Sequence, residues 1–366
     1  MSGAALPGRA AHRVLTVSLG ALIGVTAVAV PTQADATATA PATSTSAFAS
    51  GFGVGVGVGV GVGVGVGVGV GDVTEYPITT AADALPSGIT TGPDGALWFA
   101  ASGAGRIGRI TVEGSTTDFP TSSPDSLPLA VTTGPDRALW FTEGNANRIG
   151  RITTDGHLSE FPVPTADGFP AGIAAGPDGA LWFTEEDGNR IGRITPSGRV
   201  TEYPVPTPDA SPLSVAAGTD GALWFTELTG RRIGRIDGTG RITEFPLPAG
   251  SGFPDDIVAG PGGMWFTASD ANAVARIDPA GRVTRFPLPD PDSSPSGIAV
   301  GPDGQVWYAD QAGRIGRVGA SGGVAVYPVK DGADTVPFRI TAGPDRGVWF
   351  TELSGNAVGR MQTLPP

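Results

Sequence analysis

The most constraining feature of this chain is the regular spacing of its tryptophans. All seven lie in copies of one motif, such as GPDGALWFT from residue 176, at intervals of 41 or 42 residues: Trp98, Trp140, Trp182, Trp224, Trp265, Trp307 and Trp349. A period near 40 made of short strands is typical of a β-propeller blade. The 58 glycines and 34 prolines agree with this, because they disfavour long helices. We therefore predict an all-β, seven-bladed β-propeller.

Each repeat contains four short segments suited to strands, separated by turn signals. In the third repeat we expect strands near residues 172–175, 180–185, 190–195 and 200–205, with a tight turn at 176–179. The fourth segment carries Pro204, which cannot donate a hydrogen bond to a neighbouring strand. The fourth strand is therefore predicted to be the outer edge of each blade.

The order of the strand motifs predicts how the ring closes. The fourth-strand motif first occurs at residue 74 (TEYP), before the first tryptophan, whereas no such motif follows the last third-strand segment at 358–360. We expect residues 74–78 to complete the blade begun by residues 338–361, which would join the two ends of the array. The predicted propeller domain spans residues 72–366.

The segment before the propeller has two parts. Residues 1–36 resemble an export signal, with Arg9 and Arg13 before 17 apolar residues and an A-x-A sequence at 34–36. Residues 37–71 are rich in Ala, Thr and Ser and then in Gly-Val pairs, which predicts a low-complexity spacer. We expect a secreted bacterial protein with no membrane span after cleavage; the alternative is that the apolar stretch is kept as an anchor.

Composition excludes several classes of function. The net charge of −12 argues against a nucleic-acid partner, and the lack of cysteine excludes disulfides and thiolate metal sites. The chain has two histidines: His12 lies in the predicted signal, and His157 in a predicted solvated turn. A Ser-His-Asp arrangement is therefore not expected, and no imidazole remains as a near-neutral base.

Charged residues also recur with the repeat. An arginine recurs in every third strand, and an acid follows the tryptophan in five blades: Arg109, Arg151, Arg193, Arg235, Arg276, Arg317 and Arg360, with Glu143, Glu185, Glu227, Asp310 and Glu352. Charges that recur at the blade period predict scaffold ion pairs rather than a catalytic set. A functional site is expected instead where the repeats differ.

The motif GPDGALWFTE…NRIGRIT…ITEFPLP resembles the virginiamycin B lyase (streptogramin lyase) family over residues 72–361. The resemblance implies a seven-bladed propeller and a Mg²⁺-dependent carbon–oxygen lyase, which opens the ester of a cyclic depsipeptide antibiotic by elimination. The family's reacting groups include two histidines, two glutamates and a tyrosine on one face. In this chain the positions of the two histidines hold Ser296 and Phe338, those of the two glutamates hold Val336 and Glu352, and that of the tyrosine holds Ser87. Only Glu352 offers a match.

Seven positions of the form P-x-x-I or P-x-x-V vary between blades, and we expect them to surround one end of the propeller: Ser87, Leu129, Ala171, Leu213, Asp255, Ser296 and Phe338. Their small or apolar character suits a small-molecule or peptide ligand, and all except Ala171 are candidate ligand-binding residues. Asp255 and Asp256 form the acidic pair at these positions. They are candidates for Mg²⁺ or Ca²⁺, with a solvated loop as the alternative.

Two functions from different classes remain. The first is a secreted, monomeric, lyase-like propeller that binds a ligand or partner and lacks the catalytic histidines. The second is a lyase or hydrolytic enzyme that uses Mg²⁺ with carboxylates such as Asp255 and Glu352. Loss of a general base costs roughly 10²–10⁴ in rate, which favours the first.

Overall fold

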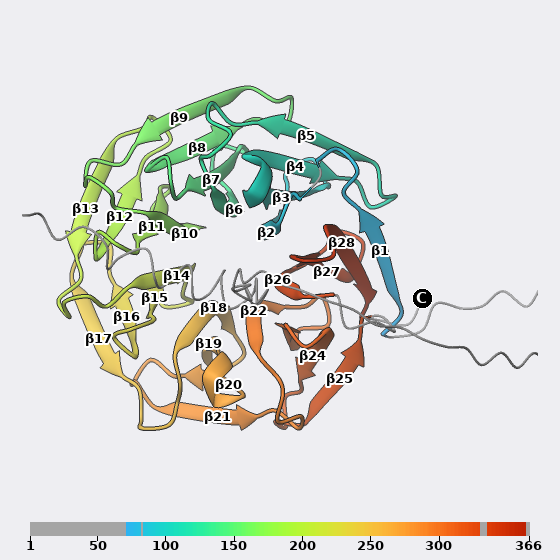
Figure 1. Cartoon of the computed structure of the whole chain (residues 1–366). Helices are drawn as coiled ribbons and strands as arrows, with labels where there is room; N and C mark the ends of the chain where they lie inside the picture. Colours follow the sequence, from blue (N-terminus) through green and yellow to red (C-terminus); the bar gives the residue numbers. More distant parts are fainter. Residues whose placement is uncertain (1–70, 82, 330–334, 364–366) are drawn as a thin grey trace, which may run out of the picture. The chain divides into compact units, whose positions relative to one another are not determined.

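The protein is a ring of seven four-stranded antiparallel sheets, seen in a computed structural model that describes residues 71–81, 83–329 and 335–363 (Figure 1). This confirms the predicted all-β, seven-bladed propeller. The predicted signal, and the predicted spacer apart from residue 71, lie outside the described residues. Within the described part of the chain, no helix is long and apolar enough to cross a membrane.

The first six blades each consist of four consecutive strands, ordered from the centre outward. Blades one to three are β2 (Pro86–Thr91), β3 (Leu97–Ala101), β4 (Arg106–Ile110) and β5 (Thr116–Pro120); β6 (Pro128–Thr133), β7 (Leu139–Glu143), β8 (Arg148–Ile152) and β9 (Leu158–Pro162); and β10 (Pro170–Ala175), β11 (Leu181–Glu185), β12 (Arg190–Ile194) and β13 (Val200–Pro204). Blades four to six are β14 (Pro212–Ala217), β15 (Leu223–Glu227), β16 (Arg232–Ile236) and β17 (Ile242–Pro246); β18 (Pro254–Gly260), β19 (Gly263–Ala268), β20 (Ala273–Ile277) and β21 (Val283–Pro287); and β22 (Pro295–Val300), β23 (Val306–Asp310), β24 (Arg314–Val318) and β25 (Val324–Pro328). Two short 3₁₀ turns, η2 (Ser102–Ala104) and η3 (Ser269–Ala271), follow β3 and β19.

Blade seven is built from both ends of the described chain. It contains β26 (Pro337–Ala342), β27 (Gly347–Glu352) and β28 (Ala357–Gln362), and its outer strand is β1 (Val73–Pro77). The β1 and β28 strands are antiparallel, with Thr74 opposite Arg360 (Figure 1). The Tyr76 ring stacks on Trp349 at 5.4 Å between centroids. The predicted closure by residues 74–78 is therefore confirmed.

The tryptophans fill the interfaces between adjacent blades, as predicted. Trp98 is fully buried and packs against Leu139 and Phe141 of the next blade. On its own blade it stacks on Phe119 of the outer strand, at 5.4 Å between ring centroids. The same stacking of a tryptophan on an outer-strand aromatic recurs in all seven blades. The apolar core is thus divided into seven similar layers between sheets.

In six of the seven blades the recurring third-strand arginine pairs with the aspartate of the turn before the second strand; in blade five, where this turn has no aspartate, Arg276 lies over the Trp265 ring. In blade three, Asp178 accepts hydrogen bonds from Arg193 Nε at 2.7 Å and from Trp182 Nε1 at 3.1 Å. Burial opposes ionisation, but these hydrogen bonds hold the pKa of Asp178 below its usual value. The expected scaffold pairing between this arginine and the acid after the tryptophan was therefore wrong, because the turn aspartate lies closer and also accepts the indole N–H.

The acid after the tryptophan is instead a buried carboxyl in blades two, three and four. Glu143, Glu185 and Glu227 end their strands opposite the first proline of the inner strand and have no exposed surface. Burial, followed by the charge of Glu244, raises the pKa of Glu227 to about 8, although Arg232 acts in the opposite direction. Burial at this position thus favours the protonated form of Glu227 at neutral pH.

Candidate functional site

The seven variable positions lie together at one end of the propeller, where the inner strands begin. Each is the second residue of an inner strand, directly after a proline, and the inner strands surround the central axis (Figure 1). We call this end the ring face and define it by Ser87, Leu129, Ala171, Leu213, Asp255, Ser296 and Phe338. Leu129 and Asp255 are partly exposed, whereas the other five are buried.

A bulge in every inner strand explains the polar contacts of the ring face. In blade three, Pro170 pairs with Glu185 and Ile173 with Phe183, so β10 advances by three residues where β11 advances by two. The extra residue removes the carbonyl of Ala171 from the ladder. That carbonyl accepts a hydrogen bond from Thr142 Oγ1 of the preceding blade at 2.7 Å. The threonine hydroxyl also accepts one from Ala130 N–H at 3.1 Å.

This contact recurs at all seven blade interfaces and forms what we call the hydroxyl belt. Its donors are the side chains of Ser87, Thr142, Thr184, Thr226, Thr267, Ser296 and Thr351. Five are threonines of the second strand. In blades one and six that position is Ala100 or Ala309, and the hydroxyl comes from the inner strand instead.

Ser87 and Ser296 therefore have a structural role that the sequence did not suggest. Ser296 is fully buried, and its Oγ donates to the carbonyl of Phe338 at 2.8 Å. Ser87 donates in the same way to the carbonyl of Leu129 at 2.8 Å. Both hydroxyls are engaged within the protein, so the ligand-binding surface is better sought among the other residues of the ring face.

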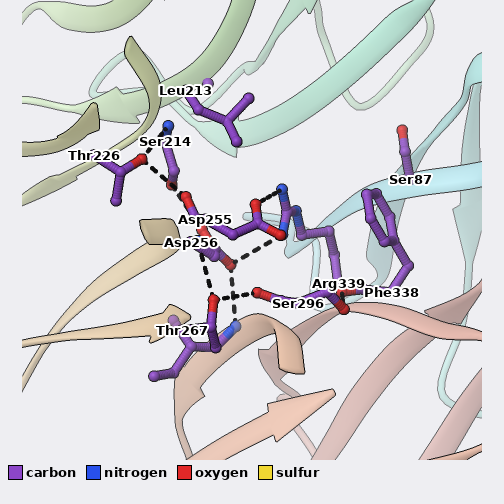
Figure 2. Close-up of polar contacts among 12 residues, drawn as sticks. Ser87, Leu213, Ser214, Thr226, Asp255, Asp256, Thr267, Ser296, Phe338 and Arg339 are labelled. Carbon is purple, nitrogen blue, oxygen red and sulfur yellow. Dashed lines mark hydrogen bonds and ion pairs between the residues drawn. The ribbon is translucent and has the colours of Figure 1, made fainter. Parts of the chain in front are cut away.

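An arginine that the sequence analysis did not single out connects blades five and seven. Arg339 Nη2 of β26 donates to Asp255 Oδ1 of β18 at 3.1 Å, and Nη1 lies 3.8 Å from Asp256 Oδ2 (Figure 2). The guanidinium also lies over the Phe338 ring, 4.6 Å from its centroid. Burial raises the pKa of Asp255, although the charge of Arg339 opposes this. Arg339 thus supplies the cation for the acidic pair.

Asp256 is committed to the scaffold as well. Its Oδ1 accepts a hydrogen bond from Ser214 Oγ at 2.6 Å (Figure 2). Oδ1 also accepts one from Ile257 N–H, and Oδ2 one from Ile298 N–H, both at 3.0 Å. A Mg²⁺ or Ca²⁺ ion requires about six oxygen ligands. No group of three or more acidic or histidine side chains suited to a metal occurs among the described residues. This donor set does not fit the metal that the sequence analysis considered at Asp255 and Asp256.

The structure also shows where Val336, Glu352 and His157 lie, and none of these three residues belongs to the ring face. The Val336 carbonyl accepts a hydrogen bond from Leu353 N–H at 2.9 Å. Glu352 is buried at the end of β27 and lies opposite Pro337, the same repeat position as Glu143, Glu185 and Glu227 in their blades. The His157 side chain is 82% exposed in a turn between β8 and β9, as expected. His12 lies outside the described residues.

The sequence analysis also missed Glu186, which directly follows β11. Its side chain is 5% exposed, and its backbone N–H donates to Phe169 O at 3.0 Å, beside the start of β10. It was overlooked because the acid before it, Glu185, belongs to the repeat. The signal was present: the other blades have Ser102, Gly144, Leu228, Ser269, Gln311 or Leu353 at this position.

Comparisons with known proteins agree with this architecture. A streptogramin B lyase structure is 32% identical, with a TM-score of 0.76, and the match covers 80% of this chain and 98% of that one. Selenomethionine-substituted virginiamycin B lyase from Staphylococcus aureus is 35% identical, also with a TM-score of 0.76, and covers 80% and 99%.

A third structure is a catalytically inactive histidine-to-alanine variant of the S. aureus enzyme with quinupristin. It is 34% identical, with a TM-score of 0.76 and coverage of 80% and 99%. No curated protein matches the chain. The virginiamycin B lyase family model matches residues 63–219 and 176–364. The chain belongs to the virginiamycin B lyase family.

Proposed function

We propose that this protein is a secreted, ligand-binding member of the family that does not perform the family's elimination. The ligand is a small molecule or peptide held on the ring face. The single observation that carries the proposal is the Arg339–Asp255 ion pair, which places a fixed cation at the acidic pair where the sequence analysis considered a metal.

The lack of an imidazole at the ring face supports this proposal. Elimination from an ester requires a base that removes the proton beside the carbonyl while the carbon–oxygen bond breaks. In the S. aureus enzyme, replacement of one histidine by alanine gives a catalytically inactive protein. In this chain the positions of the family's two histidines are Ser296, whose hydroxyl belongs to the hydroxyl belt, and Phe338.

Arg339 also argues against catalysis by a bound metal. A guanidinium has five N–H donors and no site at which a substrate oxygen could coordinate, whereas a divalent ion polarises such an oxygen directly. With Asp255 and Asp256 hydrogen-bonded to protein groups, the ring face is suited to recognition rather than to Lewis-acid chemistry. Leu129, Leu213 and Phe338 supply the apolar contacts expected of a ligand site.

The second candidate is a Mg²⁺-dependent carbon–oxygen lyase that opens cyclic depsipeptide antibiotics. The observation in its favour is the 32–35% identity to lyases of this type along nearly their whole length. Glu352 is then the remaining carboxylate at a family position. This reading needs a base other than histidine.

One assay separates the two functions. The propeller is incubated with quinupristin in Mg²⁺ and, separately, in EDTA, and the products are resolved by liquid chromatography and mass spectrometry. Elimination gives a ring-opened product of unchanged mass, whereas hydrolysis adds one water. We expect unchanged quinupristin together with a binding signal by calorimetry. EDTA-sensitive ring opening, with the S. aureus enzyme as positive control, would overturn the proposal, as would the absence of any binding.

A further inference from the structure

Glu186 departs from the repeat at a position close to the ring face. Blade three alone has an acid directly after the end of its second strand; the other six blades have Ser, Gly, Leu or Gln there. The side chain is 95% buried, since only 5% of the residue surface is exposed. A buried acid without a repeat counterpart is not explained by the scaffold that the blades share.

The equivalent residue of blade one shows where a side chain at this position lies. Ser102 Oγ is 2.6 Å from Ser87 Oγ and donates to the Pro128 carbonyl at 2.5 Å. It therefore points between the inner strands of its own blade and the next blade. In blade three these strands are β10 and β14, which carry Ala171 and Leu213.

No cation compensates the Glu186 carboxyl within the described residues. Its Oε2 is buried and has no hydrogen-bond partner there. Burial, and then the charges of Asp187 and Asp255, raise the pKa of Glu186 to about 8, and no basic group opposes them. Arg339 is already paired with Asp255. A buried carboxyl oxygen without a partner is unfavourable, and a ligand that donates a hydrogen bond to it can recover the lost free energy.

We propose that Glu186 is the ligand-anchoring carboxyl of the ring face and that it binds a protonated amine carried on an apolar or aromatic body. This inference rests on the proposed function, because it assumes that the ring face takes a small molecule or peptide. An ammonium group supplies several N–H donors to the carboxylate, and Leu213 and Ala171 contact the apolar body. The interaction requires ionised Glu186, so the carboxyl releases its proton to solvent as the cation binds.

The test compares a cation with a neutral molecule of similar size. The full propeller, with methyl labels that report on Leu213, is titrated by NMR with 2-phenylethylammonium and with 2-phenylethanol. The variants are Glu186→Gln, which keeps the shape of the side chain, and Glu113→Gln, a control at an exposed turn residue. We expect Glu186→Gln to weaken ammonium binding by about tenfold or more, and to leave phenylethanol binding and the melting temperature unchanged.

Calorimetry in two buffers of different ionisation enthalpy gives a second measurement. At pH 7 the wild type should release about one proton per ammonium bound, because a carboxyl with a pKa near 8 is mostly protonated there, and Glu186→Gln should release none. Equal affinity of the wild type and Glu186→Gln for the ammonium, or absence of proton release, would overturn the inference. If the Glu186 inference is overturned but quinupristin still binds, the proposed ligand-binding function stands. If quinupristin also shifts no Leu213 signal, the inference and the proposed function both fail.

Discussion

Replacing Ser296 by alanine tests whether this residue belongs to the scaffold or to the ligand site. In the structure its Oγ donates at 2.8 Å to the Phe338 carbonyl, which the bulge between Pro337 and Ile340 takes out of the sheet ladder. The Ser296 side chain is fully buried. Ser296→Ala therefore leaves a buried carbonyl without this donor, at a place that water reaches poorly.

The size of the effect follows from the cost of an unsatisfied buried group. Loss of one partner costs about 1–3 kcal/mol, and the small cavity left by the hydroxyl adds little, so we expect a loss of about 1.5 kcal/mol in the free energy of unfolding. With an unfolding entropy of about 2.1 cal/mol/K per residue over roughly 290 residues, this lowers the melting temperature by about 2–3 °C. Urea unfolding followed by tryptophan fluorescence should show the same loss.

A second substitution that restores the lost hydroxyl from another strand serves as the matched control. Five blades supply the belt hydroxyl from a second-strand threonine, and blade six has Ala309 at that position. Ala309→Thr in the Ser296→Ala background should restore at least half of the lost stability. If Ser296→Ala is as stable as the wild type, or if the threonine restores nothing, the belt does not stabilise the ring as argued. If quinupristin affinity falls while stability is unchanged, Ser296 is a ligand residue.

Three further perturbations test other parts of the structure. The free energy of unfolding of the wild type should fall as the pH rises from 5 to 8, because native Glu227 has a pKa of about 8 and keeps a proton that the unfolded chain releases near pH 4.5. In urea unfolding, Glu227→Gln should lose less stability over this range, by on the order of 2–4 kcal/mol. Equal pH dependence of the two proteins would refute this. Deletion of residues 74–78 should lower the melting temperature by more than 10 °C, since blade seven loses its outer strand β1 and the stacking of Tyr76 on Trp349; an unchanged melt would mean that another segment closes the ring. Arg339→Met should destabilise the protein by about 3–5 kcal/mol at pH 7 and by less at acidic pH, because burial raises the pKa of Asp255 and so favours its neutral form as the pH falls. Calorimetric unfolding at pH 7 and at pH 4 checks this; equal losses would show that the ion pair is not the cause.

The fold could be predicted from the sequence because the repeat encodes it several times over. The tryptophan period fixed the number of blades, and the early TEYP motif with no late counterpart fixed the closure by β1. The ring face was predictable because a proline marks the start of every inner strand. These features depend on chain order and strand pairing, which the spacing of residues determines directly.

The contacts within the ring face could not be predicted in the same way. The hydroxyl belt depends on a bulge that frees one carbonyl per blade, and no residue type marks such a bulge. Arg339 directly follows Phe338, the variable position of the P-x-x-I motif, and its partner Asp255 lies 84 residues earlier in the sequence. The turn aspartates were seen only as turn residues, so the arginines were assigned to the wrong acids.

The distribution of charge on the ring face is the physical basis of the ligand-binding function that we propose. The two carboxylates of blade five face one arginine, whose planar fork holds a fixed geometry and stays charged at every accessible pH. A metal ion can exchange a ligand for a substrate oxygen, but a guanidinium attached to β26 cannot. Glu186 then remains the acid of this region without a basic partner among the described residues. On our proposal, the cation that pairs with Glu186 is the ammonium group of the ligand, because Arg339 is already paired with Asp255.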